Sequence, residues 1–284
     1  MVYKLIIHYT CYVLLPIERF EIFATGLDHS EGLAFDREGI LWAGGEAGQV
    51  YRIDSRGAVT RFSDLGTFNC GLAWTPDDRE LYICNPAKGV IRMSRLGEWS
   101  VIVDTAQSKK IICANYGVFT TKGDYYFTDS GNWKKGNGRL LCLHSSGQTS
   151  VVVEPFGFAN GLARSEDDQN LFIVESDTDS VHRVDLQSGA SEVFAQGVGR
   201  MPDGLAFDAA GYLYASCYAS DDIQRIDPAG KVEQFAWDRW AILLSRPTNL
   251  AFHGDDLYVC NLGRTTITRA RAGVAGSRLA NLRS

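Results

Sequence analysis

The 284-residue sequence lacks any low-complexity tract or charge run that would serve as a linker between domains. It also lacks positive charge in excess, because its formal net charge is −6. A surface that binds nucleic acid needs a basic field, so we expect no nucleic-acid partner. The hydrophobic share of 45% and the charged share of 22% are ordinary values for a soluble globular chain.

A disulfide framework and a membrane span are also missing from the pattern. The seven cysteines are odd in number and have no framework spacing, which is typical of reduced thiols in a cytoplasmic protein. Residues 1–15 resemble a signal peptide, but they lack a small-residue cleavage site before Pro16 and are too short to span a bilayer. We therefore expect no export and no membrane partner, a tail or extra strand over 1–16, and a single domain over 17–284.

The chain does contain one short motif, called the phrase below, in six related copies: EGLAF, CGLAW, NYGVF, NGLAR, PDGLAF and TNLAF. The positions taken as equivalent are Gly32, Gly71, Gly117, Gly161, Gly204 and Asn249. Their spacings are 39, 46, 44, 43 and 45 residues. Such a period indicates a repeat protein of six units.

Each unit continues with the same succession of short apolar runs. A turn rich in Asp and Gly follows the phrase, and then come three further strand-like runs, as in ILWAG, GQVYRID and AVTRFSD of the first unit. Four short strands per unit predict an all-β, six-bladed β-propeller. The sixth unit has no clear fourth strand, so we expect the strand-like ERFEIFA at 18–24 to close the last blade.

This architecture predicts where polar residues meet. The first strand of each blade lines the central channel, so the residues before each phrase converge at one mouth. They are Glu31, Asn69 with Cys70, Asn115 with Tyr116, Asn160, Asp203, and Thr248 with Asn249. The far ends of the second strands return to the same mouth and carry Gly45, Asn85, Asp129, Glu175, Cys217 and Asn261.

Acids crowded at such a mouth repel one another and lose hydration unless a cation compensates. Carboxylate and amide oxygens are hard ligands that suit Ca²⁺, Mg²⁺ or Mn²⁺. The alternative is that each acid only bonds backbone amides at the start of its strand. For Glu31, Asn160 and Asp203 together we favour a metal site, because they share one position in three blades.

The motifs EGLAF, FANGLA and PDGLAF, with YYFTDSG at 125–131, resemble the gluconolactonase, senescence-marker-protein and luciferin-regenerating-enzyme family, over roughly residues 17–271. That family is related to strictosidine-synthase-like proteins and paraoxonases. The resemblance implies that Glu31, Asn160 and Asp203 hold one divalent cation, with Ca²⁺ preferred over Mg²⁺, Mn²⁺, Zn²⁺ or Fe²⁺. It also implies lactone hydrolysis, with a small lactone or ester as the partner molecule.

In the implied mechanism the cation polarises the lactone carbonyl and acidifies a water. Asp203 is our first choice of base and Asp129 our second, although Asp129 could equally cap its turn. Asn115 matches a family asparagine that touches substrate or metal. Where sugar-lactone members place a basic residue and an acid around that asparagine, this chain has Cys113 and Tyr116.

These departures predict a substrate other than a simple sugar lactone. We expect Asn115, Tyr116, Trp133 and Asn69 to contact it, and the loops 130–138 and 237–247 to rise over the mouth. Two other classes of function stay open. One is a propeller enzyme of other chemistry, such as organophosphate hydrolysis or a strictosidine-synthase-like condensation. The other is a ligand-binding propeller whose ring acids are structural.

Overall fold

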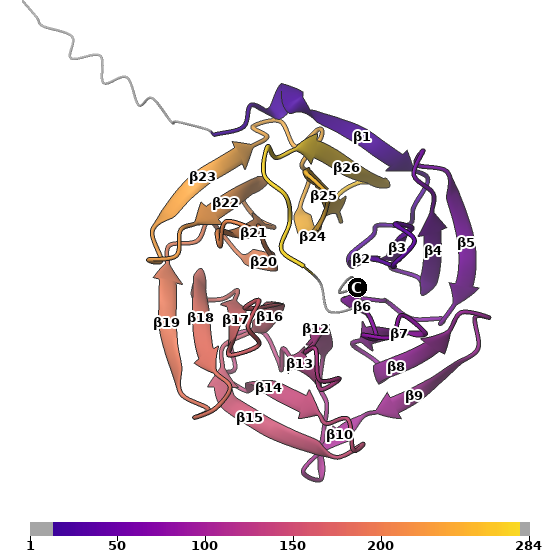
Figure 1. The fold of residues 1–284 in the computed structure, drawn as a ribbon, viewed down its shortest axis with the longest axis vertical. Coiled ribbons are helices and arrows are strands. Elements are labelled where there is room, and N and C mark those ends of the chain that lie inside the picture. The colour runs from indigo at the N-terminus through magenta and orange to yellow at the C-terminus, as the bar shows by residue number, and fades with distance from the viewer. Residues whose placement is uncertain (1–13, 279–284) are drawn as a thin grey trace, which may run out of the picture.

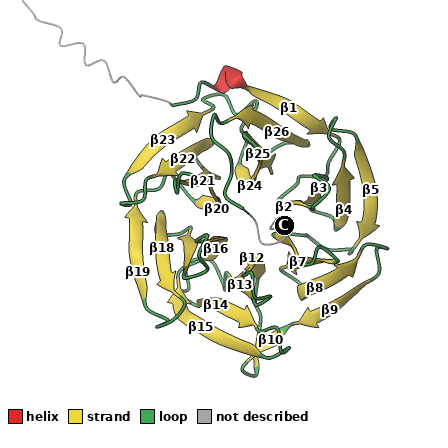
Figure 2. Cartoon of the chain, in the orientation of Figure 1, coloured by secondary structure: helices red, strands yellow, loops and turns green. Residues whose placement is uncertain are grey.

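The computed structural model describes residues 14–278, which form a ring of six four-stranded antiparallel sheets (Figure 1). Each sheet is one blade, and its first strand lies at the centre of the ring. The described residues contain a single helical turn, η1 (Ile17–Arg19), and are otherwise strands and loops (Figure 2). None of their helices has the length and apolar character needed to cross a membrane. The predicted six-bladed propeller is confirmed.

The bounds of the strands follow the sequence repeat, from the channel outward in each blade. Blades 1 and 2 contain β2 (Leu33–Phe35), β3 (Leu41–Gly44), β4 (Gln49–Ile53), β5 (Val59–Asp64), β6 (Leu72–Trp74), β7 (Glu80–Asn85), β8 (Gly89–Ser94) and β9 (Trp99–Val103). Blades 3 and 4 contain β12 (Ala114–Phe119), β13 (Tyr125–Asp129), β14 (Gly138–Leu143), β15 (Thr149–Phe156), β16 (Ala159–Arg164), β17 (Asn170–Glu175), β18 (Ser180–Asp185) and β19 (Ser191–Gln196). Blade 5 contains β20 (Pro202–Phe207), β21 (Leu213–Cys217), β22 (Asp222–Ile226) and β23 (Val232–Trp237). A two-stranded hairpin of β10 (Thr105–Ala106) and β11 (Lys109–Lys110) connects blades 2 and 3.

Blade 6 joins the two ends of the chain. Its inner strands are β24 (Pro247–His253), β25 (Asp256–Asn261) and β26 (Thr266–Arg271), and its outer strand is β1 (Phe20–Thr25). The antiparallel register places Phe20 opposite Ala270 and Thr25 opposite Thr266. This pairing confirms the predicted N-terminal strand, which covers an edge that would otherwise be open. Most of the tail predicted over 1–16 lies outside the described residues.

Short acidic side chains fix the turns between first and second strands. The Asp36 carboxylate accepts hydrogen bonds from the backbone N–H groups of Glu38 (3.1 Å) and Ile40 (2.9 Å). Asp208 does the same for Ala210 and Tyr212 in blade 5, both at 2.9 Å. These contacts replace the backbone partners that a tight turn cannot supply, and they explain why Asp begins the turn in both blades.

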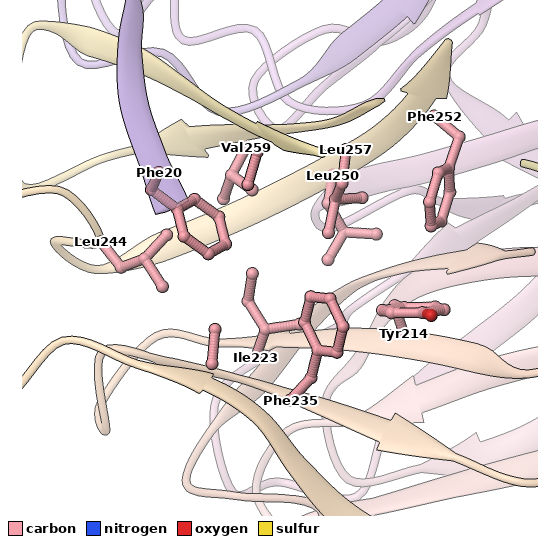
Figure 3. Packing of buried hydrophobic residues seen from close by; sticks show 11 residues of the cluster. Phe20, Tyr214, Ile223, Phe235, Leu244, Leu250, Phe252, Leu257 and Val259 are labelled. Atoms are coloured by element: carbon pink, nitrogen blue, oxygen red, sulfur yellow. The ribbon is translucent and has the colours of Figure 1, made fainter. Parts of the chain in front are cut away.

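The apolar core lies between neighbouring blades. Six clusters of buried side chains fill the six contacts between adjacent sheets. Figure 3 shows the cluster between blades 5 and 6, where Phe20 of β1 faces Ile223 and Phe235 of blade 5. Because every blade buries both faces, its inner strands are apolar on both sides. The ring is held by side-chain packing between sheets.

A central cavity of about 110 Å³ runs beneath the channel mouth. Its walls include one apolar side chain from each of five first strands, namely Leu33, Leu72, Leu162, Leu205 and Leu250. Ser277 and Arg278 lie at the far end, where Ser277 N–H donates to the carbonyl of Phe207 (2.9 Å). The polar mouth and residues 277–278 therefore lie at opposite ends of the channel.

Candidate metal and active site

The register of the first two strands places one residue from each blade at the same level of the channel. Five leucines and Gly117 each pair with an apolar residue near the end of the second strand, namely with Ala43, Ile83, Phe127, Ile173, Ala215 and Val259. Two places earlier in the chain lie Glu31, Cys70, Asn115, Asn160, Asp203 and Thr248. We call these six the ring residues.

The structure corrects the alignment of the third repeat. Gly117 takes the place that leucine has in the other blades, and Tyr116 takes the place of their glycine. A Cβ atom on Gly117 would lie 2.2 Å from the Tyr125 hydroxyl, so this blade fills the space with a tyrosine ring from the second strand. Tyr116 packs with Leu140 and Leu162 below the ring residues and is 7% exposed. Its ring lines the cavity, whereas we expected it at the mouth.

A bulge in each of the first strands of blades 3 to 6 turns the ring residues toward the channel. In blade 3, Asn115 and Tyr116 together lie opposite the single residue Thr128, and blades 4 to 6 repeat this arrangement. The Thr128 hydroxyl accepts the Tyr116 N–H (3.1 Å) and is 2.9 Å from the Asn160 carbonyl oxygen, to which it can donate. Such bulges aim side chains in a direction that a regular strand does not allow.

Four of the ring residues bury a side-chain oxygen that has no hydrogen-bond partner among the described residues. These atoms are Glu31 Oε2, Asn115 Oδ1, Asn160 Oδ1 and Asp203 Oδ1. Their residues are 4, 5, 5 and 7% exposed, in the same order. A buried polar atom without a partner costs free energy, so several at one level of a channel indicate a missing partner. Oxygen donors of this kind fit a divalent cation.

The two acids of the ring oppose each other's ionisation. Burial raises the pKa of Glu31 well above its usual value, and the negative charge of Asp203 raises it further. Burial raises the pKa of Asp203 to about 7, against a hydrogen bond from Asn160 that lowers it. A cation between the acids would reverse this effect, because it favours both charged forms.

Neighbouring blades hold these residues in place. Thr248 Oγ1 and Asn249 Nδ2 both donate to the Glu31 carbonyl oxygen, at 3.0 and 2.9 Å. Asn160 Nδ2 donates to the Ser176 hydroxyl (3.2 Å), which donates to the Pro202 carbonyl (2.6 Å). Because Asp203 follows Pro202 directly, Ser176 couples the position of the fourth-blade amide to that of the fifth-blade acid. Sequence analysis placed Thr248 and Asn249 at the mouth but gave them no role.

Asp129 has a different environment from the ring residues. Its carboxylate forms an ion pair with Arg139, which lies directly opposite on β14, and also accepts the N–H groups of Ile112 (3.1 Å) and Cys113 (2.9 Å). Asp129 is fully buried and both of its oxygens are engaged. This arrangement favours the turn-capping alternative for Asp129 over the role of base.

Asn69 is likewise engaged elsewhere. Its Nδ2 donates to the Gln49 carbonyl (3.1 Å), and its Oδ1 accepts from Asn85 Nδ2 (3.1 Å). The first contact joins the entrance of blade 2 to blade 1, and the second joins it to the second strand of blade 2. A structural role therefore explains Asn69 without a substrate.

Aromatic side chains border the mouth between blades 3 and 4. Trp133 is 40% exposed, and its ring meets that of Phe158 edge to face at 5.1 Å. Phe158 precedes the ring residue Asn160 by two places. The expected contact of Trp133 with substrate stays a prediction.

The loop after β23 has a fixed shape. The Asp238 carboxylate accepts the N–H groups of Trp240, Ile242, Leu243 and Leu244, at 2.6–3.0 Å. Leu244 is fully buried in the cluster between blades 5 and 6, whereas Trp240 stays 72% exposed. This loop crosses from the outer strand to the start of β24 without needing a ligand to order it.

A further group of ionisable side chains lies on the rim of blade 1. His29 Nδ1 is 3.1 Å from Asp28 Oδ1 and 3.3 Å from Glu46 Oε2. Asp28 also accepts hydrogen bonds from Ala47 N–H (3.0 Å) and Gln49 Nε2 (2.9 Å). These contacts account for the cluster as a cap on its turn.

Comparison with known proteins places this geometry in a family. The model of the SMP-30/Gluconolactonase/LRE-like region matches residues 83–262. The chain is 26% identical over 257 residues to lactonase drp35 of Staphylococcus saprophyticus, covering 81% of this chain and 77% of that protein. It is 25% identical over 207 residues to the protein STRICTOSIDINE SYNTHASE-LIKE 9 of Arabidopsis thaliana, covering 65% of this chain and 56% of that protein.

A solved structure shares the fold. The calcium-binding protein regucalcin of Agrobacterium tumefaciens superposes with a TM-score of 0.78 at 18% identity, covering 94% of this chain and 98% of that one. The matched family region contains the ring residues Asn115, Asn160, Asp203 and Thr248 of blades 3 to 6. The chain therefore belongs to the SMP-30/gluconolactonase/LRE-like family.

Proposed function

We propose that this protein is a divalent-metal-dependent hydrolase of lactones or related esters. The observation that carries the proposal is the set of four buried, unpartnered oxygens on Glu31, Asn115, Asn160 and Asp203. Membership of a family that contains lactonases supports the reaction class. The calcium-binding relative supports Ca²⁺ as the first ion to test, ahead of Mg²⁺, Mn²⁺, Zn²⁺ and Fe²⁺.

In this proposal Glu31, Asn160 and Asp203 hold the cation, and Asn115 binds either the cation or the substrate. When bound, a divalent cation supplies charge that stabilises an oxyanion and lowers the pKa of water. The chain's own part is to keep the donors in place through the hydrogen bonds of Thr248, Asn249 and Ser176.

Asp203 is the proposed general base. A bound cation would lower the pKa of its carboxyl, which burial alone raises to about 7, and would so keep the carboxylate ionised and able to accept a proton. Only an oxygen of Asp203 that is loosely bound to the cation could take this proton from an attacking water. Asp129 instead positions the turn before β12 through Arg139 and the backbone.

The proposed substrate carries an apolar or aromatic group. Trp133 and Phe158 offer an aromatic surface close in sequence to Asn160. Cys113 is a thiol at the position where sugar-lactone members of the family have a basic residue. Aliphatic and aromatic lactones are therefore the first substrates to assay, with a sugar lactone for comparison.

The test is hydrolysis of such a panel by chelator-treated protein, with single cations added back. We expect one cation to restore turnover, and Asp203→Ala to abolish it in every condition. Asp129→Asn serves as the matched control, because it also removes a buried carboxylate, but one that is not among the ring residues. Turnover that persists without any cation would contradict the proposal.

A second candidate is acid–base chemistry without metal, as a strictosidine-synthase-like relative suggests. The observation that favours it is the raised pKa of Glu31, caused by burial and by Asp203, which makes a neutral carboxylic acid available as a proton donor. The chelation experiment separates the two candidates, since only the metal-dependent reaction stops when the cation is removed.

A further inference from the structure

Cys70 occupies in blade 2 the position that Glu31 occupies in blade 1. The Glu31 N–H donates to the carbonyl of Gly44 (3.2 Å), as the Cys70 N–H donates to that of Cys84 (2.9 Å). In return, the N–H groups of Gly44 and Cys84 donate to the glycine that follows each ring residue, at 3.3 and 2.9 Å. Equal backbone contacts give the two side chains equivalent directions at the ring.

The Cys70 side chain is buried at the level of the two ring acids, beside the apolar cluster between blades 2 and 3. It is 2% exposed, and no hydrogen bond to its Sγ is found within residues 14–278. Burial raises the pKa of its thiol well above the usual value, and the charge of Glu31 raises it further, with smaller effects from Cys113, Cys84 and Asp203. The register of blade 2 places this buried thiol at the level of the two ring carboxylates.

We propose that Cys70 supplies a sulfur donor to the ring, so that the site binds thiophilic divalent ions through mixed oxygen and sulfur ligands. This inference rests on the metal site of the proposed function. Coordination replaces the S–H bond by a metal–sulfur bond, and the proton leaves to solvent. Carboxylate and amide oxygens alone favour hard ions, whereas a thiolate favours Zn²⁺ or Co²⁺. The ring then has a soft donor in blade 2 and hard donors in blades 1, 4 and 5.

Two neighbouring thiols differ from Cys70 in their hydrogen bonds, although Cys84 shares the cluster between blades 2 and 3 with Cys70. The Cys84 sulfur lies 3.3 Å from the Tyr125 hydroxyl within the cluster between blades 2 and 3. Cys113 lies before β12, and burial raises the pKa of its thiol to about 11 against a hydrogen bond involving Ser130. Neither is a ring residue, so both serve as controls that remove a nearby thiol without changing the ring.

The experiment is titration of the full-length, reduced, metal-free protein with Co²⁺, followed by absorption. Visible bands report cobalt bound in the site, and a near-ultraviolet charge-transfer band reports a cobalt–thiolate bond. We expect both in the wild type. Cys70→Ser should lose the charge-transfer band and weaken Co²⁺ binding by at least about tenfold, a size typical of losing one metal contact. Cys113→Ser and Cys84→Ser should keep the band.

The outcomes are distinguishable. Visible bands that vanish in Asp203→Ala, without a charge-transfer band in the wild type, would overturn the role of Cys70 and leave the oxygen site standing. A charge-transfer band that survives Cys70→Ser would also overturn it. If neither Co²⁺ nor Ca²⁺ binds to the wild type, the metal site itself fails, and the proposed function fails with it.

Discussion

At the scale of single residues, the centre of the molecule is the pair of buried acids Glu31 and Asp203. Their side chains lie at the channel mouth, and each keeps one oxygen without a partner among the described residues. Burial raises the pKa of both, and for Glu31 the charge of Asp203 adds to the effect. A pair of this kind makes the metal-free protein sensitive to pH in a direction that can be calculated.

The folded protein holds the Asp203 proton more tightly than the unfolded chain, because its pKa rises from 3.8 to about 7 on folding. The stabilising effect is fully present below the unfolded value and is lost as pH rises through the folded one. We therefore expect the free energy of unfolding, with chelator present, to fall by a few kcal/mol between about pH 4 and about pH 8. Urea unfolding across that range measures it.

Asp203→Asn is the matched control for this effect, since it keeps the shape and removes the charge. Its unfolding free energy should depend much less on pH, and saturating cation should remove most of the wild-type loss at high pH. An identical pH slope in wild type and variant would show that Asp203 does not carry the raised pKa.

Asp129 lets the structural and catalytic roles be separated. Asp129→Asn leaves the buried guanidinium of Arg139 without its counter-charge, and breaking a buried ion pair costs about 3–5 kcal/mol. We expect that loss in chemical unfolding, with kcat/KM for the best lactone changed less than about threefold per folded molecule. Asp54→Asn, in an exposed turn, controls for loss of an acid. A large fall in kcat at unchanged stability would restore Asp129 as a base.

At the scale of elements, the close approach of first strands around the channel sets the site. Gly161 shows how little room is left, because a Cβ there would lie 2.0 Å from the Asp203 carbonyl oxygen and 2.7 Å from the Gly204 Cα. Both atoms belong to the backbone and cannot give way as a flexible side chain would. The glycine of the repeated phrase thus keeps β16 against β20.

Gly161→Ala should therefore displace β20 and carry Asp203 away from its partners. We expect cation affinity to fall by more than about tenfold, measured by calorimetry on protein shown to be folded by circular dichroism. Gly136→Ala is the control, because Gly136 has a positive φ of +60° but open space around it, so it tests backbone strain alone. Equal cation affinity in the wild type and Gly161→Ala would contradict the steric account.

The elements were predictable from the sequence where the repeat is regular. Six phrases, their turns and the missing last strand predict the blades and the closing strand, because period and alternation follow directly from strand packing. The alignment of blade 3 was wrong, because Gly117 was matched to the glycine of the phrase. Gly117 instead lies at the leucine position, where the Tyr125 side chain fills the space. The role of Asp129 was also hidden, because its partner Arg139 is set by hairpin register that no local pattern reveals.

At the scale of the whole molecule, the ring depends on the contact between β1 and β26. Phe20 of β1 packs into the cluster between blades 5 and 6 (Figure 3). Its side chain is 4% exposed, whereas that of Ile22 on the same strand is 50% exposed. One strand thus offers a buried and an exposed apolar residue for comparison.

Phe20→Ala should lower the free energy of unfolding by about 3–5 kcal/mol, the usual cost of removing a buried phenylalanine. Ile22→Ala should cost less than about 1 kcal/mol because its side chain is already in contact with solvent. Thermal and urea unfolding of the two variants measure the difference. Equal losses of unfolding free energy in the two variants would show that Phe20 of β1 is not packed into the cluster between blades 5 and 6.

The central claim is that the ring binds one divalent cation through Glu31, Asn160 and Asp203. The most direct measurement is calorimetric titration of chelator-treated protein with Ca²⁺, and then with each of the other ions. The account predicts one bound ion per chain, with binding lost in Asp203→Ala and retained in Asp129→Asn. Wild-type protein that binds none of these ions, or an Asp203→Ala variant that binds as the wild type does, would contradict it.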